Sequence, residues 1–410
     1  MNDPLKQAPD ISPGMIRLLA TAAGLIVANL YYAQTLVGPI SAATGLSPEA
    51  AGLIVTLTQI GYALGLLFIV PLGDLVENRR LVVGALVATA FALVAAAVST
   101  SAWLFLAAAL CVGLGSVAAQ ILVPFAAHLS QEATRGAAVG KVVSGLLIGI
   151  MLARPAASLI ADHTSWHAVF GLAALAIFGL AVVLRFKLPQ RMPGAQLPDP
   201  RLSYGRLIAS LWALFAATPV LRRRAAYHAG LFGSFSLFWT VTPLVLQSPA
   251  FHLSQTEIAL FALVGVAGAV ASPVAGRLAD RGHTLPATAA ALLLGIAGFG
   301  LALWQPQSRL LAVGILVIAS IVLDMAVAAN LVLGQRAIFL LGAEVRSRLN
   351  GIYFALFFAG GALGSAAGAW MYAHHGWHAA VLTGMAFPAA ALLYWSGELL
   401  HRPRVAGKVA

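Results

Sequence analysis

Long apolar segments alternate with short polar ones along almost the whole chain. Each apolar segment has about the 20 residues that a membrane-spanning helix needs. A first set lies at about 15–40, 49–72, 81–99, 102–126, 139–161 and 167–185. After a polar stretch, a second set follows at about 226–247, 256–276, 286–304, 310–334, 350–373 and 378–397. The pattern predicts an all-α membrane protein with twelve transmembrane helices in two pseudo-symmetric halves of six.

The polar stretches divide the chain into five parts. We predict an N-terminal tail over 1–14, a six-helix half over 15–185, a linker over 186–225, a second half over 226–397 and a C-terminal tail over 398–410. The linker is basic and rich in proline at its start. Its residues 203–224 form a candidate surface helix that ends in Arg222, Arg223 and Arg224.

Composition supports the membrane class. The chain is 60% hydrophobic and 9% charged, whereas about a quarter of the residues of soluble domains are charged. A net charge of +11 would suit a nucleic-acid partner, but here the basic residues lie in short loops. The single cysteine, Cys111, excludes an internal disulfide, and the sequence contains no CxxC or HExxH pattern for a metal. We expect no cofactor and no nucleic-acid partner.

The basic residues also predict the orientation. Only Arg309 lies in a loop on one side, and only Arg154 lies inside a span. The other side carries Arg79, Arg80, Arg135, Lys141, the stretch 185–224, Arg277, Arg281, Arg336, Arg346, Arg348 and the C-terminal tail. By the positive-inside rule, both termini and the linker are cytoplasmic.

The two halves are sequence repeats. HTSWHA at 163–168 recurs as HHGWHA at 374–379, an offset of 211 residues. Arg135 and Gly140 recur at the same offset as Arg346 and Gly351. Another loop, with a glycine, a leucine and an acid at 73, 75 and 77, recurs at 276, 278 and 280. Halves related in this way place a binding site at the midplane between them.

These loops carry a family resemblance. GRLADRGH at 276–283 resembles the signature between the second and third helices of the major facilitator superfamily (MFS), in its second-half copy. The first-half copy, GDLVENRR at 73–80, departs from it with Glu77 and Asn78 where an Asp-Arg pair is usual. Segments 29–34, 144–155 and 323–353 are similar to a bacterial drug- and arabinose-efflux-like branch.

The resemblance implies a bacterial inner-membrane transporter that works by alternating access, with helices 1, 4, 7 and 10 around the cavity. Similarity to the efflux branch implies export coupled to proton entry. The fifth helix departs from the antiporter pattern, because Arg154 precedes Pro155 where a glycine is usual.

Asp324 is the acidic residue placed deepest in a predicted span. By helix rise it lies roughly 22 Å from Arg309 and roughly 18 Å from Arg336, near mid-bilayer. A carboxyl group there is costly and usually marks an ion, proton or substrate pathway. We expect Asp324 to be the proton-coupling residue, because desolvation favours its protonated form. The alternative is a buried structural carboxylate.

The repeat provides an internal control for both intramembrane charges. Asp324 corresponds to Gly113, and Arg154 corresponds to Ser365, at the offset of 211. The fold therefore requires neither charge. Arg154 is a candidate substrate-binding residue, or its side chain extends outward toward the nearby Asp162. The sequence leaves open whether Arg154 and Asp324 meet.

Polar and aromatic residues at depth are further candidates for substrate binding. For each, the alternative is a contact between helices or an interfacial aromatic. They are Asn29, Tyr31, Tyr32, Gln34, Gln59, Tyr62, Gln120, Trp239, Asn330 and Tyr353.

The repeated loops are candidates for gating. Their glycines permit tight turns, and their acids can pair with arginines or a helix N-terminus. The alternative is that these charges only set topology. The predicted gating residues are Gly73, Asp74, Glu77, Arg79, Arg80, Gly276, Asp280 and Arg281.

His374, His375 and His378 are more consistent with a helix-entry feature than with a metal site, because His163 and His167 occupy the same repeat position. We expect a monomeric, proton-coupled exporter of a small organic molecule and no enzyme. The alternatives are a proton symporter importing a sugar or organic anion, with Arg154 binding the anion, and a non-transporting membrane sensor.

Overall fold

The computed structural model describes residues 11–132, 134–191, 203–342 and 345–400. The outer parts of the predicted tails, 1–10 and 401–410, and the linker residues 192–202 lie outside the described residues. In the described part, every regular element is an α-helix or a 3-10 helix. Eleven helical stretches there are long and apolar enough to cross a membrane. The last, Arg346–Glu398, is interrupted at Gly376 (φ 75°), where two helices meet, so the fold has twelve spans.

The first half contains six spans. Span 1 is α1 (Pro13–Ala28) with η1 (Tyr32–Thr35), and α2 (Val37–Thr44) follows it. The others are α3 (Leu53–Phe68) with η2 (Val70–Asp74), α4 (Asn78–Ala97), α5 (Ala102–Ser116) with α6 (Ala118–Leu129), α7 (Arg135–His163) and α8 (Trp166–Lys187).

The second half follows a connecting helix, α9 (Tyr204–Ala217). Its spans are α10 (Pro219–Gln247), α11 (Gln255–Val264) continued by η4 (Gly265–Val270) and α12 (Ala271–Asp280), α13 (Thr284–Ala302), α14 (Arg309–Phe339) and the two parts of α15 (Arg346–Leu400). The predicted helix over 203–224 is wrong at its end. Proline at the first position of α10 begins a new helix, so Arg222, Arg223 and Arg224 belong to α10.

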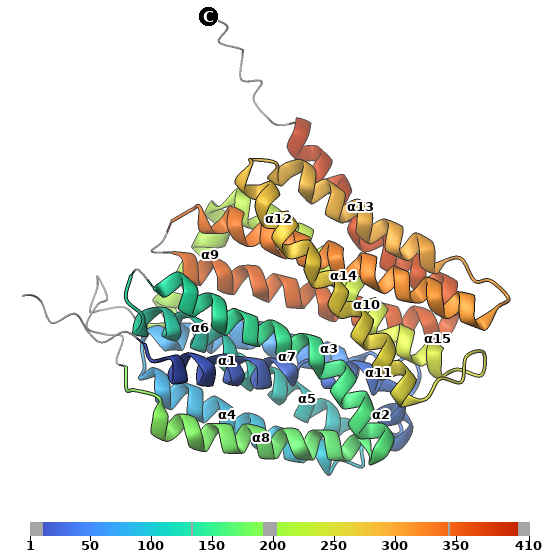
Figure 1. Cartoon of the computed structure of the whole chain (residues 1–410), viewed down its shortest axis with the longest axis horizontal. Helices are drawn as coiled ribbons and strands as arrows, with labels where there is room; N and C mark the ends of the chain where they lie inside the picture. Colours follow the sequence, from blue (N-terminus) through green and yellow to red (C-terminus); the bar gives the residue numbers. More distant parts are fainter. Residues whose placement is uncertain (1–10, 133, 192–202, 343–344, 401–410) are drawn as a thin grey trace, which may run out of the picture.

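The two halves lie against each other as two layers of helices (Figure 1). The end of the bundle that carries the loops 75–77, 130–132 and 281–283 is called the basic end. The opposite end, with the loops 45–52, 164–165 and 248–254, is called the far end. Across the interface of the halves, α7 packs against α11, and α3 packs against α15.

Hydrogen bonds join the halves from the far end to mid-bundle. Thr256 donates to the Asp162 carboxylate (2.5 Å), and Ser365 donates to the carbonyl of Gly52 (3.0 Å). Thr56 donates to the carbonyl of Ala362 (3.2 Å). These bonds close the far end across the interface of the two halves.

Glycines allow close helix approach inside the first half. A Cβ at Gly149 would collide with the backbone of Gly24, and one at Gly145 would collide with Ala20. Helix α7 therefore lies directly on α1, as small residues permit in membrane bundles. This packing holds Arg154, one turn beyond Gly149, against the first span.

The repeat is visible in hydrogen bonds. His163 bonds through Nδ1 to the carbonyl of Leu159 (2.9 Å), and His374 bonds in the same way to Trp370 (2.9 Å). Each pair is four residues apart, and the two pairs are related by the offset of 211. The histidines thus cap the same helix end in the two halves.

Candidate functional site

Two oppositely charged side chains lie in the middle of the bundle. Arg154 comes from α7 of the first half and is 4% exposed, and Asp324 comes from α14 of the second half and is 9% exposed. The guanidinium therefore does not extend outward toward Asp162. Both charges lie against the same residue, Trp239 of α10.

Aromatic rings surround the Arg154 guanidinium. Its Cζ lies 4.3 Å from the ring centroid of Trp239, 4.9 Å from that of Phe235 and 5.4 Å from that of Tyr31. Such faces attract a cation, more strongly when water is excluded. Nε also donates to Oε1 of Gln34 (2.8 Å). The first half thus supplies the cation, and both halves supply its surroundings.

Asp324 is fixed at the N–H edge of the indole. Trp239 Nε1 donates to its Oδ1 over 3.2 Å. A Cβ at Gly265 or Gly268 would collide with Asp324, so these two glycines let the irregular part of span 8 approach the carboxylate. The 3-10 segment η4 of span 8 begins at Gly265.

The other predicted pocket residues form separate contacts. Gln120 donates to the hydroxyl of Tyr62 (3.1 Å), and Gln59 donates to Ser236 of the other half (2.9 Å). Asn29 donates to its own helix at Ile26 (3.0 Å). Of the twelve predicted proton-coupling and substrate-binding residues, the structure brings together five: Tyr31, Gln34, Arg154, Trp239 and Asp324. Tyr32 is half-buried in η1, in contact with both hydrophobic cores.

A second buried polar group surrounds His228, which the sequence analysis missed. Its Nδ1 lies 3.1 Å from Nδ2 of Asn330, and its ring stacks on Tyr353 and Phe357. His228 Nε2, Asn330 Oδ1 and the Tyr353 hydroxyl are enclosed without a partner among the described residues. The signal was a histidine within an apolar span, on the helix that also carries Trp239.

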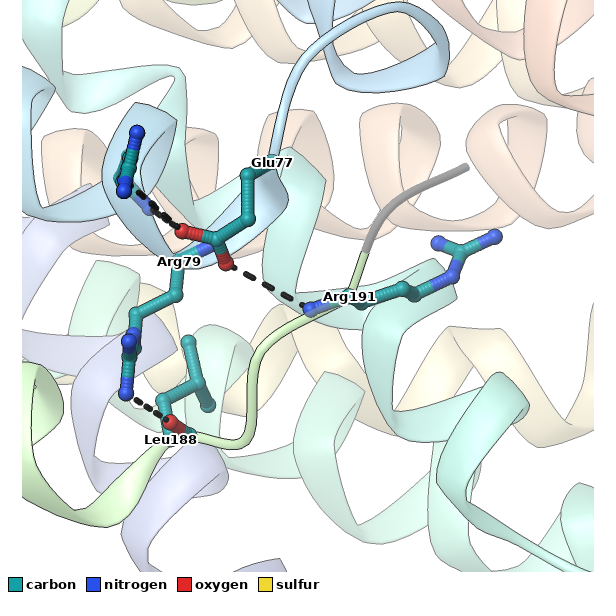
Figure 2. A network of polar contacts seen from close by, with 5 residues as sticks. Glu77, Arg79, Leu188 and Arg191 are labelled. Carbon is teal, nitrogen blue, oxygen red and sulfur yellow. Dashed lines mark hydrogen bonds and ion pairs between the residues drawn. The ribbon is translucent and has the colours of Figure 1, made fainter. Parts of the chain in front are cut away.

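The first predicted gating loop binds the start of the linker. Glu77 caps α4 by accepting from the backbone N–H groups of Arg79 (2.9 Å) and Arg80 (3.1 Å). It also accepts from the backbone of Arg191 (3.4 Å), and Arg79 donates to the carbonyl of Leu188 (3.4 Å), as Figure 2 shows. These contacts stay within the first half and its linker.

The second copy behaves similarly. Asp280 pairs with Arg336 of its own half, and the backbone N–H of Arg281 ends α12. The prediction that the glycines of these loops form tight turns is wrong, because Gly73 lies in η2 and Gly276 lies in α12. Gly282 (φ 77°) makes the turn after α12 instead, in a conformation that favours glycine.

Asp74 differs from the other gating candidates because it faces the opposite half. It lines a small cavity at the basic end together with Arg348 and Gly351 of α15 and Leu211 of α9. Asp74 interacts electrostatically with Arg191 at the start of the linker and with Arg348 of the other half. The pair with Arg348 is a contact that a change in the packing of the halves would alter.

Comparison with family profiles and with curated proteins matches the chain to a family of transporters. A family profile described as Major Facilitator Superfamily matches residues 19–338. The transporter YgaY of Escherichia coli O157:H7 is 40% identical over 387 residues, which are 94% of this chain and 96% of YgaY. A probable transporter of Streptomyces coelicolor is 33% identical, over 88% of this chain and 82% of its own length.

Solved structures share the fold. A bacterial homologue of the human lysosomal transporter Spinster, in an inward-facing and occupied conformation, aligns with a TM-score of 0.73 at 15% identity. The alignment covers 96% of this chain and 98% of that one. The nucleoside transporter NupG aligns with a TM-score of 0.70 at 15% identity, over 93% of this chain and 99% of that chain.

Proposed function

Because the chain belongs to the major facilitator superfamily and is a multi-pass membrane transporter, we propose that it exports a small organic molecule in exchange for protons. The observation that carries this proposal is the central site. A buried arginine and a buried aspartate from opposite halves meet on one tryptophan ring. A site built from both halves is remodelled whenever the halves move relative to each other.

Asp324 is the proposed proton-binding residue. It is almost fully buried, and Trp239 is the only hydrogen-bond donor to it among the described residues. Burial favours the neutral carboxyl, whereas the nearby cation favours the carboxylate. Access to water from one side or the other then decides whether Asp324 holds its proton. Arg154 is the proposed contact for the solute.

The proposed orientation places the basic end and both termini in the cytoplasm of a bacterium, with the protein in the inner membrane. The positive-inside distribution of arginines and lysines supports this orientation. With it, the far end faces outward, and the inter-half bonds of Thr256, Ser365 and Thr56 close that side. Breaking these bonds while closing the basic end, where Asp74 faces Arg348, would complete the alternation.

We propose a monomer, since one chain supplies both halves, and a proton gradient as the energy source without a bound cofactor. The solute and protons are its partners, with the lipid bilayer around it. Import by symport is the second candidate. Arg154 at the central site supports it equally, because an imported organic anion would bind the same guanidinium.

A thermal-shift screen of the purified full-length protein at pH 6 and pH 8 tests the proposal. The panel contains lipophilic cations, antibiotics, sugars and carboxylates. A ligand at 100 times its dissociation constant adds about 2.7 kcal/mol of stability if it binds only the folded state. In an exporter that exchanges solute for protons, the two compete, so stabilisation is larger at pH 8. Asp324→Asn removes the pH dependence.

If sugars or carboxylates stabilise the protein more at pH 6 than at pH 8, the result would favour symport over export. Stabilisation that is equal at both pH values in the parent protein would contradict proton coupling at this site. Arg309→Gln, at the far-end start of α14, is the control and should behave as the parent protein does.

A further inference from the structure

The two central charges share a site but do not pair. Among the described residues, the ion pairs are Arg80–Glu77, Arg223–Glu398 and Arg336–Asp280, and none joins Arg154 to Asp324. Opposite charges attract strongly where water is excluded. Something must therefore hold these two groups apart.

The surrounding contacts keep them apart. Trp239 offers its ring face to Arg154 and its N–H edge to Asp324, so the two groups contact different parts of the same indole. Gln34 holds Nε of the guanidinium, and Phe235 covers it. Closely packed glycines fix the position of the carboxylate. Both charges are thus positioned in advance, close to each other but outside ion-pair distance.

Their hydrogen-bonding groups are only partly used. Nε is the one guanidinium nitrogen of Arg154 that donates a hydrogen bond to the described residues, and Oδ2 of Asp324 accepts none. Neither the terminal nitrogens nor Oδ2 are among the fully enclosed unpartnered atoms, so each keeps contact with free space. Gln34 Nε2, in contrast, is an enclosed donor without an acceptor.

These unused groups indicate the chemistry of a ligand that would fit the site. Two terminal guanidinium nitrogens bind a carboxylate in paired, charge-assisted hydrogen bonds. Gln34 accepts from Nε and so leaves the terminal nitrogens of the same guanidinium available to a ligand. Oδ2 of Asp324 is an acceptor that suits an ammonium group. A ligand with only one of these charges would leave the other buried charge without a partner, which is costly.

We propose that the transported solute is a small zwitterion, with its carboxylate on the terminal nitrogens of Arg154 and its ammonium group on Asp324. This inference rests on the proposed function and gives it a chemical basis. A proton that binds Oδ2 neutralises Asp324 and takes the position of an ammonium N–H. The ammonium group leaves unchanged, so proton binding and solute release occur at the same oxygen.

Matched probes test this assignment with the full-length protein in detergent at pH 8. Phenylalanine carries both charges, phenylpropionate lacks the ammonium group, and phenethylamine lacks the carboxylate. Corresponding sets are made for leucine and glutamine. Binding is measured by calorimetry on the parent protein, on Asp324→Asn and Arg154→Gln, and on Arg309→Gln as the control.

We expect at least one zwitterion to bind about tenfold or more tightly than both of its singly charged analogues, as buried charge pairs at interfaces do. In Asp324→Asn, the zwitterion and its carboxylate analogue should bind equally. In Arg154→Gln, the zwitterion and its amine analogue should bind equally. Arg309→Gln should keep the parent preferences.

A carboxylate or amine analogue that matches its zwitterion in the parent protein overturns the inference, as does the absence of binding by every zwitterion. The proposed function is judged separately, by a measurement that needs no solute. This measurement asks whether the distance between two spin labels, one in each half, changes with pH. If that distance responds to pH through Asp324 while no zwitterion is preferred, only the inference fails. If it does not respond, the proposed function fails.

Discussion

The two halves resemble each other at their helix ends and differ at their centre. His163 and His374 cap equivalent helices through equivalent bonds. At the centre, Arg154 of the first half corresponds to Ser365 of the second, which bonds to Gly52 and Thr240 in the interface. Asp324 corresponds to Gly113, where a Cβ would collide with the carbonyl of Thr58.

The difference separates what builds the fold from what distinguishes this transporter. At each position, one half uses a small residue for packing or sealing, and the other half carries a charge. The geometry that the two halves share at their helix ends does not depend on a charge at the centre. The two central charges are therefore additions to a repeated scaffold, and substitutions at the two kinds of position should have different effects.

Arg154→Gln should produce the largest effect on transport. It removes the cation from the aromatic surround and leaves Asp324 without an opposite charge nearby. We expect the transport rate in proteoliposomes to fall about 100-fold or more, because the solute loses its guanidinium contact and the buried Asp324 loses the nearby cation. Arg154→Lys keeps the charge but not the planar stacking, so it should restore only part of the rate. Full activity of Arg154→Gln would remove this residue from the site.

Trp239→Phe should have the next largest effect. The ring still covers Arg154, but the hydrogen bond to the Asp324 carboxylate is lost, and bonds to charged groups contribute about 1.5–3 kcal/mol. We expect solute affinity to fall about tenfold. Trp212→Phe on α9, where the side chain is 71% exposed, is the matched control and should leave affinity unchanged. Equal effects of the two substitutions would argue against a bridging role for Trp239.

Gly149→Val tests the packing that positions Arg154. The new side chain collides with Gly24, and overpacking of this kind costs about 1–3 kcal/mol. The melting temperature of the detergent-purified protein should fall. Gly179→Val in α8 adds the same side chain where no atom lies within 4 Å, so its melting temperature should match the parent. A large loss in both variants would point to helix propensity and not to the close approach.

His163→Phe and His374→Phe should have the smallest effects, and these should be similar. Each substitution keeps an aromatic ring and removes one hydrogen bond at an exposed helix end. We expect changes of about 0.5 kcal/mol or less in unfolding free energy, with normal transport. A transport defect in either variant would break the distinction between ends and centre.

The sequence was sufficient to predict the twelve spans, because segment length and hydropathy report directly on the bilayer. It also placed Asp324 and Arg154 inside spans, since a charge within an apolar segment is conspicuous; their roles stay predictions. That they share Trp239 could not be predicted, because the contact joins three helices whose rotation depends on packing. The mistaken end of the linker helix has a local cause: Pro219 begins a helix inside what looked like one polar stretch.

The contacts of the predicted gating loops could not be predicted from the sequence either. Glu77 and Asp280 repeat along the chain, and both bind within their own half. Asp74 alone among the predicted gating acids lines a cavity with residues of the other half, including Arg348, although it also interacts with Arg191 of the linker. Which acid faces which half depends on the turn of η2, and the residue pattern alone does not specify it.

The central claim, that Asp324 couples protonation to the movement of the halves, is tested most directly by an interspin distance. Spin labels at Lys141→Cys on α7 and Arg277→Cys on α12, both exposed, report the separation of the halves at the basic end in a Cys111→Ser background. Double electron–electron resonance at pH 6 and pH 8 gives the distance distributions without any solute. We predict a distribution that shifts with pH in the labelled parent and does not shift in Asp324→Asn. The same pH-dependent shift in both proteins would contradict the account.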